Sequence, residues 1–567
     1  MTRERNTPPP HDQMIETALR LHRQGAATEA IAALRTVLCQ APAQVDALHL
    51  LGALVLSGHA AAPAVYILRW AMSAGGETAA GLVNFGAALT EMGRPQEAET
   101  ALRRAITLDP ASPLAWNNLA TALRGQRRFA EALAALDHAT VLAPDFALAW
   151  RLRAETLLDL GRPADAIATL QPWLERMPDD ATARHLTGVG HHRQGETDAA
   201  ITWYRQALAL QPDKTASWAN LGLALLADGV FDDAITTCRH AIRLDPEEAG
   251  AHNNLSMALL LAGRMEEGLR EHEWRLHLDH FLGLSHAGRR WNGEDLDGGT
   301  LLVVAEQGLG DTLQFIRFAR QARDRVGRLI LECPPALASV AASARGVDAI
   351  VPPGTAPACD AWVPLLSLPL LLGLRDVAAI PAWPSYLSAP AEARERWRPR
   401  LDQAGPGLRV GLIWGGNPEQ PHNYRRSAPL SALAPLVEVP GVRFFSLQMG
   451  APAAELARSE LADRITDLTP MIVDFGDTAA IMSQLDLVIS VCTSSAHLAG
   501  ALGVPTWVLL SHVADWRWFL DREDSPWYPS ARLFRQPAHG DWNSVAAAVA
   551  AALPELTRRQ DQADASV

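Results

Sequence analysis

Residues 110–144 read PASPLAWNNLATALRGQRRFAEALAALDHATVLAP, and this stretch decides the fold of the first half of the chain. It begins and ends on a proline, and the same interval of 34 residues recurs along the chain, at Pro42, Pro110, Pro144, Pro178, Pro212 and Pro246, with Gly76 in the one position that breaks the series. Other residues share this period, namely Trp116, Trp150 and Trp218 and, in another phase, Ala30, Ala64, Ala132 and Ala234. A fixed period of this length predicts an array of stacked structural repeats.

Each repeat has the pattern of two packed helices. Ala132, Leu136 and Ala139 follow the i, i+4, i+7 spacing of a single helix face. Small alanine side chains let two antiparallel helices approach closely, and a proline is tolerated in the turn between helices. We count eight such pairs over residues 11–280, the last one degenerate because Gly268 replaces the usual alanine. The array resembles tetratricopeptide repeats, which implies an α-solenoid with a concave inner surface that binds a protein or peptide partner.

Asparagines recur two residues after the tryptophan position of the first helix in a repeat, at Asn84, Asn118, Asn220 and Asn254. An amide carries both donors and an acceptor, so a row of them could grip an extended peptide backbone. A similar row is a feature of the superhelix of eukaryotic protein O-GlcNAc transferase. The alternative is that these are ordinary solvated residues, and Leu50, Leu152 and Leu186 interrupt the row.

From residue 300 the pattern changes to short apolar runs that alternate with helical stretches, which predicts an α/β fold with parallel sheets. We expect strands at residues 301–305, 328–332, 348–351 and 361–363, and again at 409–414, 443–447, 465–467, 486–491 and 506–510. The domains predicted from this are a disordered N-terminus (1–10), the repeats (11–280), a linker (281–299), two Rossmann-like domains (300–385 and 386–556), the second with a returning C-terminal helix, and a tail (557–567).

The loop after the first strand of this region is the first place where chemistry is expected. It carries Gly308, Gly310 and Asp311 and opens a helix, in a position where α/β proteins bind ligands. The glycines allow a backbone to approach closely, and a helix N-terminus attracts anions. Asp311 could cap its helix or remove a proton from a bound hydroxyl group.

Two further loops follow strands of the second Rossmann-like domain. One ends in Arg425 and Arg426, a pair that fits a phosphate clamp or a solvated surface. The other contains Thr493, Ser494, Ser495 and His497, where a helix N-terminus and hydroxyl groups could hold a diphosphate. His497 could face the ligand or form a structural hydrogen bond. A nearby aromatic segment, with Trp516, Trp518 and Trp527, is expected to pack the junction between domains rather than to cover a ligand.

These three loops, in this order, resemble the motif blocks of bacterial glycosyltransferases of the GT-B fold, in particular the ADP-heptose:lipopolysaccharide heptosyltransferase-like group. Taken whole, the chain resembles bacterial tetratricopeptide-repeat-containing glycosyltransferases. The resemblance implies Asp311 as catalytic base, and Arg426 or Arg425 with the 493–497 block as binding groups for a nucleotide-diphosphate sugar. It also implies an inverting, metal-independent reaction with no cofactor besides the sugar nucleotide. Cys492 departs from the family, which has an aspartate there.

Composition limits the alternatives. The net charge of −13 argues against a nucleic-acid partner, and no apolar run is long enough for a membrane span. The five cysteines lack metal-site spacing, the start of the chain lacks the apolar core of a secretory leader, and we therefore expect a cytoplasmic protein without a metal. Two other functions stay open: a non-catalytic interaction scaffold with a degenerate transferase-like domain, and a sugar-nucleotide epimerase or hydrolase.

Overall fold

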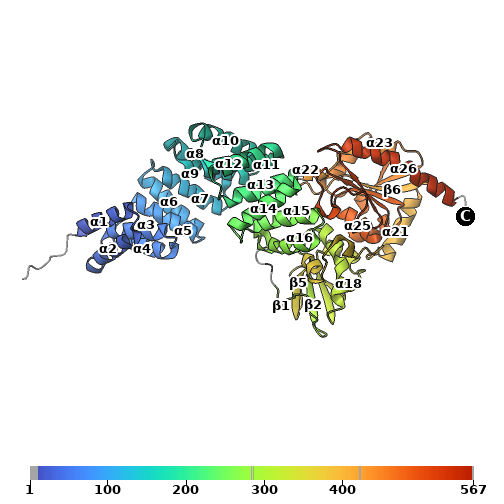
Figure 1. The fold of residues 1–567 in the computed structure, drawn as a ribbon, viewed down its shortest axis with the longest axis horizontal. Helices are drawn as coiled ribbons and strands as arrows, with labels where there is room; N and C mark the ends of the chain where they lie inside the picture. The colour runs from blue at the N-terminus through green and yellow to red at the C-terminus, as the bar shows by residue number, and fades with distance from the viewer. Residues whose placement is uncertain (1–10, 282–283, 285, 421–422, 565–567) are drawn as a thin grey trace, which may run out of the picture. The chain divides into compact units, whose positions relative to one another are not determined.

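The computed structural model describes residues 11–281, 284, 286–420 and 423–564, so the predicted disordered N-terminus lies outside the described residues. The chain divides into two compact units, residues 1–212 and 213–567. In the first unit the helices are α1 (His11–Arg23), α2 (Ala27–Gln40), α3 (Val45–Ser57), α4 (Ala61–Ser73), α5 (Ala79–Glu91), α6 (Pro95–Leu108), α7 (Pro113–Gly125), α8 (Phe129–Leu142), α9 (Ala147–Asp159), α10 (Pro163–Arg176), α11 (Ala181–Gln194) and α12 (Thr197–Leu210). They follow one another as the predicted helix pairs, coloured blue to teal in Figure 1.

The period of 34 residues corresponds to a repeated hydrogen bond. The Nε1 atoms of Trp116 and Trp150 each donate to the carbonyl oxygen of the proline six residues earlier, at 3.0 Å. At the next repeat the Nε of Arg184 donates to the carbonyl of Pro178 at 2.8 Å. Different side chains with an N–H donor therefore serve the same purpose, which is to tie the start of one helix to the turn before it.

A second periodic feature is a small residue where the two helices of a repeat touch. A Cβ atom added to Gly86 would lie 2.5 Å from Cγ of Leu102, and one on Gly188 would lie 2.7 Å from the ring of Tyr204. Alanine or serine occupies the same position elsewhere, at Ala120, Ala154 and Ser256. The close approach of the helices therefore depends on small residues at this position.

The second unit begins inside the repeat array. Its repeat helices are α13 (Thr215–Asp228), α14 (Phe231–Leu244), α15 (Ala249–Leu261) and α16 (Met265–His272), followed by the short 3-10 helices η1 (Glu273–His277) and η2 (Asp279–Phe281). Leu260, Leu261, Met265 and Leu269 belong to the same apolar core as the two sheets. The last repeats are thus part of the α/β body.

The α/β part contains two parallel sheets (Figure 1). The first consists of β1 (Arg289–Arg290), β2 (Thr300–Val304), β3 (Arg328–Glu332), β4 (Ala349–Val351) and β5 (Ala361–Pro364), in the order β1-β5-β2-β3-β4. The second consists of β6 (Leu408–Ile413), β7 (Val442–Ser446), β8 (Ile465–Asp467), β9 (Leu487–Val491), β10 (Thr506–Leu510) and β11 (Ala531–Arg535), in the order β11-β10-β9-β6-β7-β8. That second order is the doubly wound one of dinucleotide-binding folds.

The helices of this part are α17 (Leu309–Phe315), α18 (Ala319–Arg323), α19 (Ala338–Ala341), α20 (Leu368–Leu371), α21 (Ala391–Asp402), α22 (Asn423–Arg426), α23 (Ala434–Val437), α24 (Phe475–Met482), α25 (Ser494–Leu502) and α26 (Trp542–Asp564). The remaining 3-10 turns are η3 (Ile316–Phe318), η4 (Pro335–Leu337), η5 (Leu365–Ser367), η6 (Val377–Ala379), η7 (Leu430–Leu433), η8 (Ala451–Arg458), η9 (Thr469–Met471) and η10 (Trp516–Trp518). No helix among the described residues is long and apolar enough to span a membrane.

Every predicted strand lies within one residue of an observed one, but one strand was missed and three expectations need correction. The segment predicted as a linker, 281–299, contributes β1, which pairs with β5. Strand β11 was not predicted. The C-terminal helix does not return to the first α/β half, because Val545, Val549 and Leu553 of α26 lie in the core on one face of the second sheet. This helix also continues beyond residue 557, where a tail was expected.

Candidate functional site

In the first sheet, the order of strands reverses between β2 and β5, and the loops after these two strands start the candidate site. Such a reversal is where open α/β sheets bind ligands. Glu306, just after β2, spans the two loops, since its carboxylate accepts the backbone N–H groups of Leu365 at 3.0 Å and Leu366 at 3.3 Å. The predicted loop at residues 306–312 is thereby fixed at its first residue.

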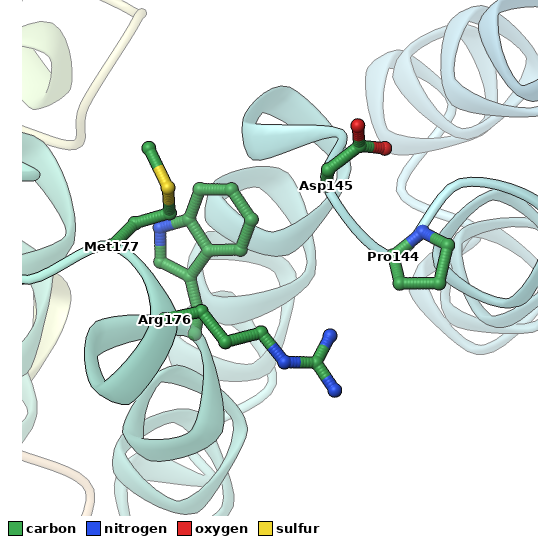
Figure 2. Close-up of a pocket in the computed structure, with 5 residues that line it drawn as sticks. Pro144, Asp145, Arg176 and Met177 are labelled. Atoms are coloured by element: carbon green, nitrogen blue, oxygen red, sulfur yellow. The ribbon is translucent and has the colours of Figure 1, made fainter.

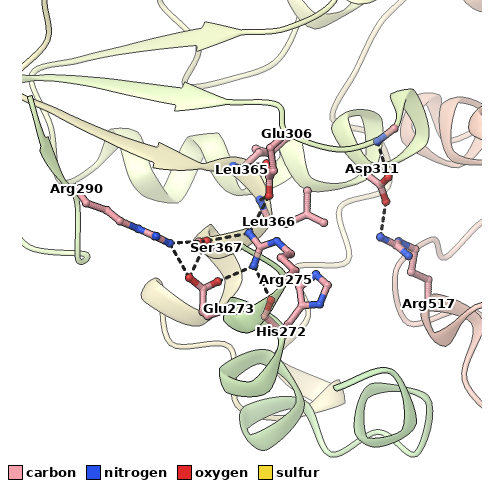
Figure 3. A network of polar contacts seen from close by, with 11 residues as sticks. His272, Glu273, Arg275, Arg290, Glu306, Asp311, Leu365, Leu366, Ser367 and Arg517 are labelled. Carbon is pink, nitrogen blue, oxygen red and sulfur yellow. Dashed lines mark hydrogen bonds and ion pairs between the residues drawn. The ribbon is translucent and has the colours of Figure 1, made fainter. Parts of the chain in front are cut away.

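The last repeat reaches this loop through a buried ion pair (Figure 3). Arg275 of η1 pairs with Glu306 at 2.8 Å, and each side chain is only 1% exposed. Arg275 also pairs with Glu273 at 2.9 Å, whose carboxylate accepts the hydroxyl of Ser367 at 3.0 Å. Burial raises the pKa of Glu306, and the Arg275 guanidinium acts in the opposite direction. The sequence did not single out either partner.

Asp311 caps its helix, which is one of the two roles that the sequence left open for it. Its Oδ2 accepts the backbone N–H of Gly308 at 2.9 Å, while its Oδ1 pairs with Arg517 of η10. Figure 3 shows the Asp311 carboxylate facing the guanidinium of Arg517. Burial raises the pKa of Asp311, and the charge of Arg517 opposes this rise. Asp311 is thus an anchored carboxylate that joins the two α/β halves.

Arg517 is the functional candidate that sequence reasoning missed. Its Nη1 donates to both carboxylate oxygens of Asp515, at 2.9 and 3.1 Å, and its guanidinium lies 4.5 Å from the ring centre of Trp516 and 5.5 Å from that of Phe315. Although burial disfavours its charge, Asp515 and Asp311 raise the pKa of Arg517. The sequence signal that could have revealed it is an aspartate and an arginine within a tryptophan-rich segment. Such a segment is expected to be buried, and charged residues are buried only when they are paired.

The N-terminus of α25 has no side-chain cap, because Thr493 occupies the N-cap position without accepting a backbone N–H. The hydroxyl groups of Ser494 and Ser495 have no hydrogen-bond partner among the residues that the structure describes. A Cβ on Gly310 would lie 3.3 Å from Cα of Ser494, so the first turns of α17 and α25 pack together. Gly310 was expected to allow the close approach of a ligand. In the structure it allows the close approach of the α25 backbone instead.

Cys492 and His497 belong to the packing around this turn. Trp518 donates its Nε1–H to Cys492 Sγ at 3.0 Å, and burial raises the pKa of the thiol to about 11. His497 was predicted to bind the sugar nucleotide, but its Nδ1 shares a hydrogen bond of 2.8 Å with the hydroxyl of Tyr528, and its ring stacks on Trp518 at 5.3 Å. Burial lowers the pKa of His497 to about 3, so the ring is neutral and offers no charge to an anion.

The predicted aromatic packing is confirmed. Trp516, Trp518 and Trp527 are each no more than 3% exposed and form part of the core between the α/β halves. Phe315 at the end of α17 and Phe318 in η3 are buried in the same core.

The arginine pair follows β6, next to β9, where the order of the second sheet reverses. Arg426 donates to Oδ1 of Asn423 at 3.2 Å and to Oε1 of Gln420 at 2.5 Å. A Cβ added to Gly416, just after β6, would lie 3.0 Å from the Nε of Arg426, so this side chain lies against the end of β6. Arg425 stacks on the exposed ring of Tyr424, at 5.7 Å from its centre.

The asparagines do not form a uniform row. Asn254 is buried, and its Nδ2 donates to the carbonyl of Ala219 at 3.1 Å, so it stabilises contacts between repeats. Asn84, Asn118 and Asn220 are half-buried. Asn118 accepts a hydrogen bond of 3.4 Å from the side chain of Asn117. The prediction that all four contact a peptide is therefore wrong in the case of Asn254.

A small hollow of about 180 Å³ lies on the repeats, lined by Pro144, Asp145, Trp173, Arg176 and Met177 (Figure 2). It contains none of the predicted site residues. No cluster of three or more histidine, cysteine or carboxylate side chains arranged for a metal ion occurs in the described part of the chain.

Comparison with known proteins identifies the repeats. Residues 89–156, 151–215 and 219–273 match the tetratricopeptide repeat, so this part of the chain is a tetratricopeptide array. Protein FlbA of Caulobacter vibrioides is 30% identical over 293 residues, which are 47% of this chain and 48% of that protein. The chain thus spans about half the length of this curated relative.

Solved tetratricopeptide proteins are also similar. One from Parabacteroides merdae is 15% identical with a TM-score of 0.38, covering 44% of this chain and 98% of that one. A thermophilic one from Thermus thermophilus is 23% identical with a TM-score of 0.29, covering 32% of this chain and all (100%) of that one.

Proposed function

We propose that this protein is a glycosyltransferase that moves a sugar from a nucleotide diphosphate to a hydroxyl group on a protein bound by the repeats. The observation that carries the proposal is the meeting of two strand-end regions: the first turn of α17, with Asp311, packs against the first turn of α25 and pairs with Arg517. In each sheet these loops lie where the strand order reverses, which is where α/β folds bind ligands.

The second half offers a place for the diphosphate. The uncapped N-terminus of α25 presents backbone N–H groups, and the hydroxyls of Ser494 and Ser495 lie beside it. Arg426 follows β6, the strand that pairs with β9, and β9 leads into α25. A helix N-terminus and a guanidinium both favour phosphate oxygens. They also stabilise the charge that grows on the leaving diphosphate as the sugar departs.

Asp311 supplies the base. A carboxylate has about four lone-pair positions, so its bonds to Gly308 and Arg517 leave positions that can accept an acceptor hydroxyl. The hydroxyl oxygen forms a bond to the anomeric carbon, its proton passes to Asp311, and the bond to the diphosphate breaks with inversion. Burial raises the pKa of Asp311, which strengthens it as a base.

The acceptor follows from the repeats. Tetratricopeptide arrays bind extended or helical segments of other proteins on their inner surface. We propose that Asn84, Asn118 and Asn220 contribute to this contact, and that the bound protein presents a serine or threonine hydroxyl group to Asp311.

The test compares the full-length protein with its Asp311→Asn variant. Thermal shift and transfer assays use ADP-, GDP- and UDP-sugars, with release of the nucleotide diphosphate as readout. We expect a donor that raises the melting temperature, and a loss of turnover of about 10²- to 10⁴-fold in Asp311→Asn. Its melting temperature should fall, because Arg517 loses one of its two carboxylate partners, although an asparagine oxygen can still accept the N–H of Gly308. Asp524→Asn, which alters an exposed pair with Arg522, is the control.

A non-catalytic scaffold is the second candidate, and two observations favour it. Both oxygens of Asp311 already have partners, and Cys492 stands where the resembled family has an aspartate. A scaffold predicts no melting shift with any sugar nucleotide and equal, background release of diphosphate from both proteins. Turnover that disappears with Asp311→Asn would reject it.

A further inference from the structure

We infer that Arg517 is a positioning residue that aims the Asp311 carboxylate at the acceptor hydroxyl, an inference that rests on the proposed transferase function. Arg517 belongs to η10, after the fifth strand of the second sheet, whereas Asp311 belongs to the first half. The pair therefore holds the base in place from the opposite side of the site.

The guanidinium is itself fixed in direction. Its side chain is 7% exposed, two of its hydrogen bonds go to Asp515 of the same turn, and the rings of Trp516 and Phe315 lie against it. Because the guanidinium is planar and rigid, these contacts fix the direction of the N–H that reaches Asp311. Its Nε has no hydrogen-bond partner in the described part of the chain.

With Arg517 on Oδ1 and Gly308 on Oδ2, the carboxylate cannot rotate without losing a bond. The remaining lone pairs then point in a fixed direction. A general base must lie within hydrogen-bond reach of the proton it removes, so a freely rotating carboxylate would be less effective.

The same contact controls ionisation of the base. Burial favours the protonated acid, Arg517 favours the carboxylate, and Asp515 opposes Arg517. Two rings also lie in this region, His272 of α16 and His497 of α25. Burial lowers the pKa of both, so neither contributes charge near neutral pH. Arg517 and Asp515 should therefore shift the pKa of Asp311 in opposite directions.

The experiment is the pH profile of kcat/KM for the full-length wild type and three variants. Activity requires ionised Asp311, so the acidic limb of the profile follows its pKa. In Arg517→Gln the carboxylate loses its cation, its pKa rises, and the limb should move to higher pH by about one to three units. Asp515→Asn removes a like charge and should move the limb to lower pH. Arg517→Lys keeps the positive charge but lacks the planar guanidinium that holds Asp311 in one direction. The acidic limb should therefore stay at the same pH while kcat falls.

Arg522→Gln, which breaks an exposed pair with Asp524 two residues away, is the matched control and should match the wild type. The inference is overturned if wild type is active and Arg517→Gln leaves the acidic limb where it was. If Arg517→Gln does not fold, Asp515→Asn provides the test. An acidic limb that stays at the wild-type pH or moves to higher pH in Asp515→Asn contradicts the inference. A wild type without transfer activity rejects the proposed function itself, and the inference with it.

Discussion

Individual residues of the site are defined by their surroundings more than by their type. Asp311 could cap a helix or serve as a base, and the structure shows the cap, with one oxygen on Gly308 and the other on Arg517. His497 could bind an anion, yet burial keeps it neutral and Tyr528 holds its Nδ1. Cys492 is half-buried, and its sulfur accepts a hydrogen bond from Trp518.

Cys492 should therefore be an unreactive thiol. With a pKa of about 11, about one thiol in a thousand is ionised at about pH 8, and only the thiolate is nucleophilic. We expect iodoacetamide to modify exposed Cys39 at least tenfold faster under native conditions, as measured by mass spectrometry of tryptic peptides. Modification of Cys492 should accelerate about tenfold per pH unit below pH 11. Equal rates at the two cysteines near neutral pH would contradict the assigned environment.

At the scale of elements, the repeats depend on contacts between helices that only small residues permit. Gly52, Gly86, Gly188 and Gly222 share one repeat position, and at each the added Cβ would lie under 3.0 Å from a side chain of the second helix. The hydrogen bonds to the proline carbonyls recur with the same period. The repeat is thus defined by a small contact residue and a tethered turn.

Gly86→Val should destabilise the first unit. The new side chain would overlap Leu102, whose Cγ is 2.5 Å from the position of the added Cβ, and overpacking of a core costs about 1–3 kcal/mol. Ala87→Val on the same helix is the control, because this half-buried neighbour shares the cost of a β-branched residue in a helix. Urea unfolding followed by circular dichroism measures both. If the two substitutions lower the free energy of unfolding by the same amount, the close contact between Gly86 and Leu102 does not matter for stability.

At the scale of the whole molecule, the division into units does not follow the change from repeats to sheets. The second unit starts at residue 213, so α13 to α16 belong with the α/β part. Leu260, Met265 and Leu269 bury their side chains in the core of that part, and Arg275 pairs with Glu306 inside it. The last repeats therefore form a structural base for the candidate site.

Two truncations should test this role of the last repeats. A fragment of residues 213–567 should fold cooperatively, whereas one of residues 300–567 should expose the apolar surface that α15 and α16 cover and leave Glu306 buried without Arg275. An uncompensated buried charge costs about 3–5 kcal/mol. Size-exclusion chromatography, dye binding to apolar surface and urea unfolding by tryptophan fluorescence measure the difference. A monomeric 300–567 fragment as stable as 213–567 would show that the last repeats are dispensable.

Local patterns were sufficient to predict most of the helix pairs and strands. The 34-residue period of Pro110 and its counterparts predicted the helix pairs, and apolar runs predicted strands such as β2 and β9 to within one residue. Strand β11 was missed because Arg532 and Arg535 give it an amphipathic pattern, and β1 because it has only two residues. Such elements depend on the pairing of strands, which short-range sequence does not encode.

The sequence by itself determined the repeat array, the parallel α/β character and the loops that carry Asp311, Arg426 and Ser494, because periodicity and strand-end position are local properties of a chain. Only the tertiary structure decided which charges meet: Arg517 reaches Asp311 across 206 residues of sequence, and Arg275 reaches Glu306 from the last repeat. It also decided that His497 and Asn254 pack inside the protein. The reason is physical: a buried charge or amide is stable only with a partner, and that partner is chosen by the packing of distant elements.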